Sequence, residues 1–272
     1  MMKTAPYLLL AALPLALAST LSAQSPREII ERSLELQDAR MRGVENFTIV
    51  QELNGQEMQQ YYEPRDVGSH RVFIPTRTLL GGRTLDLPEE QSNDPFYNYE
   101  QWVGNARVIR SESVEGHEAW VIETDALEAM GGAAMPPEAQ LREGRVRMFV
   151  DKEEYVVRRM EFEGTADIQG QPREMSMTAE LGDFRNVEGV LQPFTVLMTV
   201  HGAMSDDESA QMRDALAEME KRLAELPESV RAQVEGQMRA QIEAMRGASG
   251  GEGMQIRMQT KEIRVNQGPP GA

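Results

Sequence analysis

The sequence predicts an α+β fold: a curved antiparallel β-meander forming an incomplete barrel, covered by an N-terminal helix and an inserted helical hairpin. Many short segments alternate apolar and polar residues between brief turns, which is typical of antiparallel strands. A capped segment with helical spacing precedes them, and two more helical segments interrupt them near the end. About nine or ten strands with a single apolar face imply a sheet that curls or is covered by helices.

Composition excludes several classes of function. The chain has 272 residues, 28 basic and 44 acidic side chains, a formal net charge of −16 and no cysteine. Without cysteine there is no disulfide, thiolate metal site, cysteine nucleophile or N-terminal lipidated cysteine. The negative charge argues against nucleic-acid binding. Because His70, His117 and His201 are far apart and lack ligand spacing, we predict neither a metal site nor a cofactor.

The first 23 residues predict an export signal. Lys3 precedes a 12-residue apolar run at 7–18, which is too short to span a bilayer that needs about 20 residues. Small residues follow, and we place the cleavage after Ala23, with Ala18 as the alternative. The expected mature protein is exported, soluble and periplasmic.

The amino-terminal half predicts one helix and two hairpins. Ser25 and Glu28 form a capping box, and Pro26 occupies the first helical position. Asn54-Gly55 is a type I′ turn signal. The expected elements are a helix at 26–42, strands at 47–53 and 58–62, a strand at 71–74 closed by Pro75, a long loop at 76–94, a helical turn at 96–103, and strands at 107–111 and 119–124.

The carboxy-terminal half predicts a meander interrupted by a helical insertion. After a connection at 127–137, strands are expected at 145–150, 156–163, 173–181, 194–200 and 254–265. A second capping box at Ser205 opens a helical hairpin at 205–247. The apolar parity of the last strand switches between Met258 and Ile263, which predicts a bulge near Lys261. We expect one domain at 24–267 and a disordered tail at 268–272.

Parity places one set of apolar residues on a common sheet face. Methionine is unbranched and polarisable, so a surface rich in it can repack around an irregular apolar ligand. One interpretation is therefore a cavity for acyl chains; the other is an ordinary core between sheet and helices. The candidate cavity residues are Phe47, Ile49, Met148, Val150, Met160, Phe162, Met175, Met177, Met198 and Met258.

Arg158 shares parity with Met160 and Phe162, so it is expected to point inward near the rim of the sheet. It is either an arginine whose head reaches water or a positive group at the cavity mouth. The apolar stripe of the hairpin is open to two interpretations as well: packing within the chain, or binding to a partner. As a part of the fold, the hairpin is expected to be a lid over the methionines, the alternative being an accessory arm.

No catalytic motif is present, so we predict that the protein is not an enzyme and name no catalytic residue. His117-Glu118 lacks the second histidine of a zinc-protease motif, and neither a phosphate loop nor a Gly-x-Ser-x-Gly elbow occurs. In so acidic a chain, paired carboxylates indicate a solvated face. A hydrolase with an unrecognised site is the remaining alternative.

Three segments resemble the outer-membrane lipoprotein-sorting proteins, the LolA/LolB-like family. These are VEGHEAWVIET at 114–124, RVRMFVDKEEYVVRRMEFEG at 145–164 and FRNVEGVLQPFTVLMTV at 184–200. The family repeatedly shows a Val-Asp/Glu-Gly turn before a strand, a strand ending in Asp-Lys-Glu, and a Val-Asp/Glu-Gly segment followed by proline. The resemblance covers about residues 25–204 and 254–266. The hairpin at 205–247 and the loop at 76–94 depart from the compact carriers of the family.

The resemblance implies an incomplete antiparallel barrel, closed by helices, around a hydrophobic cavity. It implies a periplasmic carrier of lipoprotein acyl chains or another lipid, a transport chaperone in outer-membrane lipoprotein sorting. Its partners would be lipoprotein-transfer proteins of the inner and outer membranes. The same family fold also serves envelope-stress sensors of the RseB type. The alternative is therefore a sensor or interaction protein that uses the hairpin as a docking arm.

Overall fold

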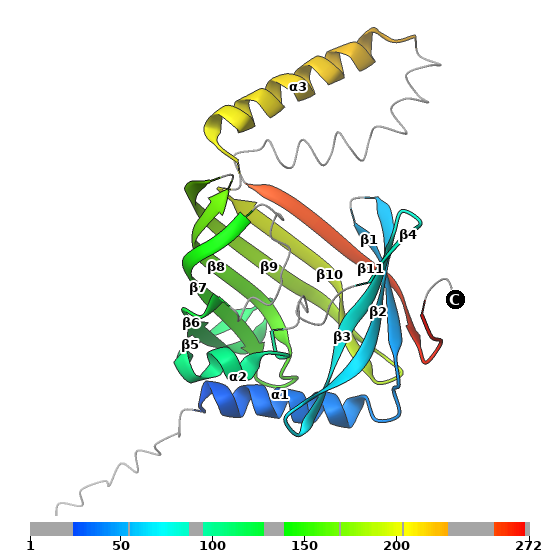
Figure 1. Cartoon of the computed structure of the whole chain (residues 1–272), viewed down its shortest axis with the longest axis vertical. Coiled ribbons are helices and arrows are strands. Elements are labelled where there is room, and N and C mark those ends of the chain that lie inside the picture. The colour runs from blue at the N-terminus through cyan, green and yellow to red at the C-terminus, as the bar shows by residue number, and fades with distance from the viewer. Residues whose placement is uncertain are drawn as a thin grey trace, which may run out of the picture.

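The computed structural model describes residues 24–53, 55–86, 95–127, 139–168, 170–202, 204–227 and 253–269. These residues form one eleven-stranded antiparallel sheet in the order β4-β3-β2-β1-β11-β10-β9-β8-β7-β6-β5. The sheet curls into a barrel that stays open, because β4 and β5 are separate edges (Figure 1). The predicted incomplete barrel is confirmed, with eleven strands instead of nine or ten.

Most strands are longer than the sequence pattern indicates, whereas β1 and β11 have the predicted bounds. Their bounds are β1 Phe47–Leu53, β2 Gln56–Val67, β3 His70–Leu80, β4 Arg83–Asp86, β5 Arg107–Val114, β6 His117–Thr124, β7 Ala139–Asp151, β8 Val157–Ile168, β9 Gln171–Val187, β10 Val190–His201 and β11 Met254–Val265. Neighbours in sequence pair, except that β4 and β5 are the two edges of the sheet and β11 lies between β1 and β10. The first and last strands are therefore paired with each other.

Helix α1 (Pro26–Arg40) runs along one end of the barrel (Figure 1). Its predicted capping box is present, because Ser25 and Glu28 exchange backbone–side-chain hydrogen bonds. The helix is tied to the turn between β7 and β8, since the Ser33 hydroxyl donates to the Tyr155 carbonyl at 2.6 Å and the Arg40 guanidinium donates to the Glu154 carbonyl at 2.8 Å.

A short helical segment follows the first four strands. It consists of α2 (Tyr99–Trp102) and the 3₁₀ turn η2 (Val103–Asn105), where the helical turn was predicted. Tyr99, Trp102 and Val103 are buried. Figure 1 shows α2 beside α1, so its aromatic side chains lie at the end of the barrel that α1 covers.

The region around Pro75 corrects the prediction. The strand predicted to stop at Pro75 continues to Leu80, and residues 83–86 of the predicted loop form β4. Pro75 pairs with Tyr62, and the register shifts at the next step so that Arg77 pairs with Tyr61. Proline cannot donate to a ladder and is tolerated at such an irregularity. The bulge predicted near Lys261 is confirmed: Thr260 pairs with Gln51 and Glu262 with Val50, leaving Lys261 over.

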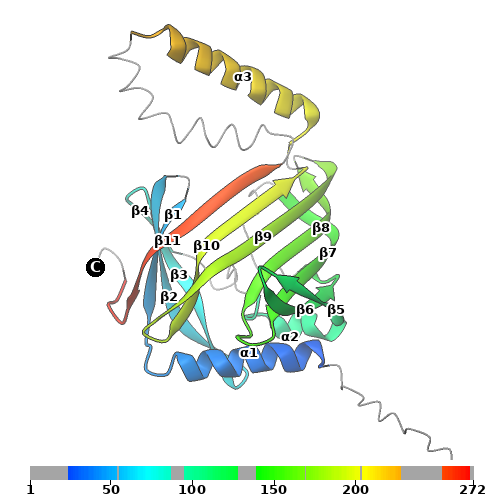
Figure 2. The ribbon, with the colours of Figure 1, turned by 180° about the vertical axis from the view of Figure 1, so that it is seen from behind.

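Helix α3 (Asp206–Glu225) is the first arm of the predicted insertion. Its capping box joins Ser205 to Glu208. The Arg173 guanidinium, 2.8 Å away, and the N–H and hydroxyl of Ser205 lower the pKa of Glu208 to about 2. Figures 1 and 2 show that α3 extends away from the end of the barrel opposite α1. The described arm therefore does not cover the interior of the sheet.

Some predicted features fall on residues outside the described ranges: the export signal at 1–23, Asn54, part of the loop at 87–94, most of the connection at 127–137, the second helical arm from 228, and the last three residues. Among the described helices, none is both long and apolar enough to cross a membrane.

Candidate functional site

Cross-strand pairing aligns the candidate residues of β7–β10 into two apolar rows. Paired residues in a sheet share a face, so each row runs across neighbouring strands on one side. The first row is Ile122, Met148, Met160, Ala179, Met198 and Ile256. The second row is Thr124, Val146, Phe162, Met177, Val200 and Met254. Across β6–β11, the residues of each row therefore lie on the same face of the sheet.

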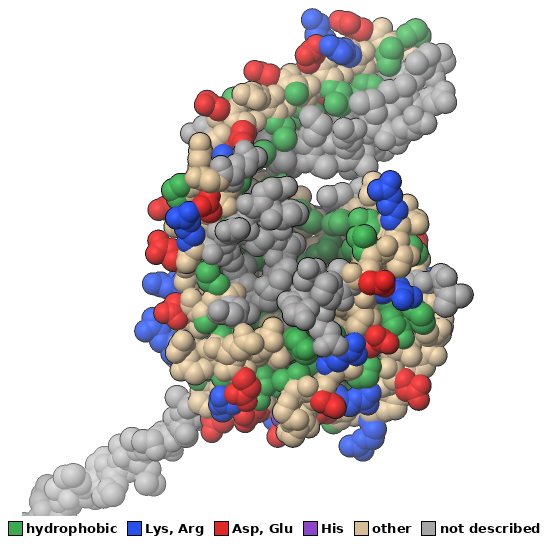
Figure 3. Space-filling model, in the orientation of Figure 1, with side chains coloured by type: hydrophobic (Ala, Val, Ile, Leu, Met, Phe, Trp, Pro, Cys, Tyr) green, Lys and Arg blue, Asp and Glu red, His purple; other side chains and the backbone are tan. Residues whose placement is uncertain are grey.

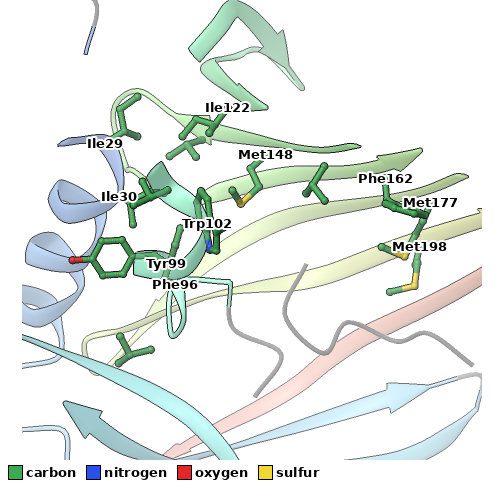
Figure 4. Packing of buried hydrophobic residues seen from close by; sticks show 14 of the residues in the cluster. Ile29, Ile30, Phe96, Tyr99, Trp102, Ile122, Met148, Phe162, Met177 and Met198 are labelled. Atoms are coloured by element: carbon green, nitrogen blue, oxygen red, sulfur yellow. The ribbon is translucent and has the colours of Figure 1, made fainter. Parts of the chain in front are cut away.

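Most of these side chains are buried in one cluster. Met148 is 0%, Phe162 1%, Met177 3% and Met198 6% exposed, and Val150 and Met175 are buried with them. Met160 packs against the same cluster but is only partly buried. Figure 4 shows Phe162, Met177 and Met198 gathered at one end of the cluster, while Met148 lies closer to Trp102.

Two glycines orient Phe162. Gly144 and Gly164 are paired residues of β7 and β8. A Cβ built on Gly144 would lie 2.3 Å from the Phe162 ring, and one on Gly164 would lie 2.8 Å from it. The ring therefore lies against bare backbone, and any larger residue at these two positions would displace it.

The other end of the cluster is closed by helices. Ile29, Ile30 and Leu34 of α1 are fully buried against it. Trp102 is fully buried as well, and its indole N–H donates to the Pro95 carbonyl at 2.9 Å. Figure 4 shows Trp102 between Ile30 and Met148. The position of Trp102 is not predicted from the sequence, because no local signal indicates that α2 packs beside α1.

Three candidate residues lie outside this cluster. Phe47 and Ile49 are buried in a second cluster with Met41, Phe73 and Phe194. There Phe47 stacks on Tyr62 with ring centroids 4.6 Å apart. Met258 is half-buried and pairs with Leu53 and Val196, in neither cluster. The structure thus brings together the seven candidates of β7–β10 and separates these three.

Arg158 occupies a different environment from the one its parity predicts. The ladder between β7 and β8 shifts register, since Phe149 pairs with Arg159 but Val150 pairs with Val157. Arg158 is therefore the extra residue. It is 5% exposed, and its guanidinium contacts Asp151 and Glu154 at 2.6 Å each and lies over the Phe184 ring. Its head neither reaches water freely nor joins the methionine cluster.

Asp151 organises the turn beside Arg158. Its side chain accepts hydrogen bonds from the backbone N–H groups of Glu153 and Glu154, and from the Arg158 guanidinium. Burial alone would raise the pKa of Asp151, but these donors together hold the pKa below its ordinary value. The Asp-Lys-Glu turn that carries part of the family resemblance is thus a structural ion-pair site.

The opposite face of the same strands carries charges. Glu123 contacts Arg107 at 2.7 Å and Arg147 at 3.0 Å, and Arg147 also approaches Glu161 at 3.5 Å. Burial would raise the pKa of Glu123, but the neighbouring guanidiniums hold it below its ordinary value. By contrast, the two rows on the inner face are apolar except for Thr124, which is buried and accepts a hydrogen bond from the Ala126 N–H. Across the same ranges no group of acidic or histidine side chains could hold a metal ion.

The open side of the barrel is hollowed. Figure 3 shows hydrophobic side chains set back within the part of this hollow that the described residues form. A separate cavity of about 460 Å³ lies between the end of α1 and the turn joining β2 to β3. Its lining is mixed: it combines Asp38 and His70, which contact each other at 3.4 Å, with apolar side chains such as Phe73. The apolar hollow is therefore the candidate ligand site.

No protein-family model matches the chain, and no curated protein matches it. Three solved structures are similar in fold. One is named an outer-membrane lipoprotein-sorting protein domain, from Vibrio parahaemolyticus, with 12% identity over 89% of this chain and 95% of that one, at a TM-score of 0.42. A LolA superfamily protein from Nitrosomonas europaea shares 12% identity over 91% of this chain and 96% of that one, with a TM-score of 0.35. A DUF1329 family protein from Desulfovibrio piger shares 7% identity over 90% of this chain and 95% of that one, with a TM-score of 0.39.

Proposed function

We propose that this protein is a carrier that binds the acyl chains of a lipid or lipoprotein against the apolar inner face of its open barrel. The observation that carries the proposal is the pair of largely apolar rows on one face of six strands, in a barrel whose open side is hollowed (Figure 3). An acyl chain offers only apolar surface, and burying it gains about 0.8 kcal/mol per methylene.

The chemistry of the inner face favours a flexible apolar ligand over a reacting substrate. Four methionines, Met148, Met160, Met177 and Met198, contribute thioether side chains that adopt several rotamers at little cost. The charged side chains of the described strands pair with each other on the opposite face. The proposed role is therefore binding and transport without catalysis.

The cellular setting of the proposal comes from the sequence. The export signal at 1–23 directs the chain out of the cytoplasm, and the three motif segments resemble periplasmic lipoprotein carriers. We propose a periplasmic protein in outer-membrane lipoprotein sorting, with lipoprotein-transfer proteins of the two membranes as partners.

One observation favours the alternative of a sensor or interaction protein. Helix α3 extends away from the barrel (Figures 1 and 2), a position suited to a docking arm. Capture of a membrane-bound regulator that depends on α3, without any bound lipid, would support the sensor.

Native mass spectrometry of the exported protein tests the carrier directly. We expect co-purified mass that corresponds to acyl chains, and saturable binding of a fluorescent fatty acid after its removal. A delipidated protein that shows no saturable binding of the fluorescent fatty acid would refute the carrier and leave the inner face as an ordinary core.

A further inference from the structure

At the closed end of the interior, specific polar contacts join α2 to α1. Glu100, on α2, forms a two-pronged ion pair with Arg27 of α1, both contacts at 2.9 Å. The Arg27 guanidinium also lies over the Tyr99 ring. Together with the bond from the Trp102 indole to the Pro95 carbonyl, these contacts fix α2 against α1. The indole of Trp102 is therefore hydrogen-bonded to Pro95, and the helix that carries it is joined to α1 through Arg27.

The position of Trp102 makes it a boundary within the apolar cluster. Figure 4 shows Ile30 and Tyr99 on the α1 side of the indole, and Met148 on its other side. Beyond Met148, toward the far end of the cluster, lie Phe162, Met177 and Met198. A chain that enters along these methionines meets Trp102 before it meets α1.

The chemistry of the cluster also sets the direction of entry. The buried hydrophobic side chains that cluster with Trp102 include Ile30, Tyr99 and Met148, and the buried carboxylates Glu123 and Asp151 are already paired with arginines. An ionised headgroup in this region would lose its hydration without a partner, at a large cost in free energy. The methyl end of an acyl chain therefore enters first, and the headgroup stays at the open side.

From these observations we infer that Trp102 is the floor of the acyl-chain site and determines the length of chain that the site accepts. The inference rests on the proposed lipid-binding function and adds the selecting residue. Affinity rises roughly fourfold for each methylene that becomes buried, and the rise stops when the methyl end reaches the indole.

Tryptophan quenching tests the contact. The chain has two tryptophans, Trp102 and Trp120. We expect a fatty acid brominated at its methyl end to quench the wild-type protein and Trp120→Phe, but to lose most of its quenching in Trp102→Phe. A fatty acid brominated beside its carboxylate should quench Trp102 weakly. Equal quenching by the two probes, or none by the methyl-end probe, overturns the inference.

A chain-length series tests selection. Saturated fatty acids from octanoate to stearate compete with a fluorescent fatty acid in the wild type and in Trp102→Phe, whose smaller ring deepens the floor. We expect the affinity maximum to move to a longer chain, with a gain of roughly fourfold per added methylene. Phe149→Leu is the matched control, because Phe149 is a fully buried aromatic residue of a separate cluster. It should leave the maximum unchanged.

The outcomes separate the two hypotheses. If the wild type binds no fatty acid saturably, both the proposed carrier function and the role of Trp102 in setting chain length are refuted. If the wild type binds saturably but its preferred length is the same in Trp102→Phe, the carrier stands and the floor is wrong. A shift of the same size in Phe149→Leu would also refute the floor, because it would reflect general loosening of the fold.

Discussion

The inner and outer faces of β6–β10 come from the same strands but differ in chemistry, because the inner face is largely apolar and the outer face carries charged side chains. On the inner face, Met148, Phe162 and Met177 are buried with apolar neighbours only. On the outer face, one residue away along each strand, Arg147 and Glu161 belong to a network of ion pairs. Partly exposed pairs such as Arg147–Glu161 contribute about 0–1 kcal/mol each. The difference teaches that the outer face combines charged side chains with a small apolar cluster around Phe149, whereas the inner face holds the larger apolar cluster and the proposed site.

The largest expected effect comes from a charge placed on the inner face. Met177→Glu buries an unpaired carboxylate beside Phe162 and Val200, its cross-strand partners. We expect loss of fatty-acid binding and destabilisation by several kcal/mol, measured by denaturant unfolding. Met177→Leu, which conserves volume, should cost less than about 1.5 kcal/mol.

The outer face supplies the control for Met177→Glu. Thr199 pairs with Thr178 and Gln255, neither of which is charged. Thr199→Glu should therefore change stability by no more than about 0.5 kcal/mol and leave fatty-acid binding intact. Equal damage from the two substitutions would show that the faces do not differ as described.

Alternation made much of this comparison predictable from sequence. The strands at 145–150, 173–181 and 194–200 alternate with period two apart from Phe149 and Leu197, so parity predicts that Met148, Met177 and Met198 lie on the more apolar face of their strands. The bulge at Lys261 was also predictable, because the apolar parity of that strand visibly switches. Such patterns depend only on residues that are close in sequence, so they can be recognised without knowledge of the fold.

The rest depends on contacts between distant residues. The bulge that removes Arg158 from the inner face is accompanied by no change of apolar parity, and Asp151, seven residues away, binds its guanidinium. Pro75 predicts the end of a strand, but β3 continues beyond it because its pairing with β2 shifts register between Tyr61 and Tyr62. Trp102 becomes a floor only because α2 docks on α1 through Arg27 and Glu100. No spacing in the sequence reports these pairings.

A second prediction compares a fully buried ion pair with a partly exposed one. Asp151→Asn leaves the buried Arg158 with Glu154 as its remaining carboxylate partner, and we expect a loss of about 3 kcal/mol in unfolding free energy. Glu161→Gln, on the outer face beside Arg147, should cost less than about 1 kcal/mol. Similar losses in the two variants would contradict the assignment of Asp151 as the organiser of the turn.

The pH dependence of stability sharpens the same comparison. The folded-state pKa of Asp151 lies below its ordinary value of 3.8, so its contribution is fully present above that pH. As pH falls below 3.8 and through the folded-state pKa, the carboxylate is protonated and the contribution is lost. Unfolding curves below pH 3.8 should therefore converge for the wild type and Asp151→Asn. A constant gap down to low pH would be inconsistent with a role of the Asp151 charge.

The smallest expected effect comes from removing the arm that carries α3. Residues 205–250 would be replaced by a short Gly/Ser linker that retains Gly202 and Gly253, because a Cβ at Gly202 would lie 2.0 Å from the Glu174 carbonyl oxygen. Val200 pairs with Met254, so β10 and β11 already meet as a hairpin where the arm leaves the sheet. The described part of α3 contributes no residue to the buried clusters. We therefore expect the melting temperature to change by less than about 4 °C.

The same deletion decides between a lid and an accessory arm. If the arm covered the inner face, removing it would expose the methionine rows, raise the binding of a hydrophobic dye and cause aggregation. Because α3 extends away from the barrel, we expect the deletion variant to stay monomeric with unchanged dye binding (Figure 2). Fatty-acid affinity should also be unchanged, since Trp102 and the methionine rows are built from α2 and β6–β11. A rise in dye binding together with aggregation would instead support the prediction from the sequence that the hairpin is a lid.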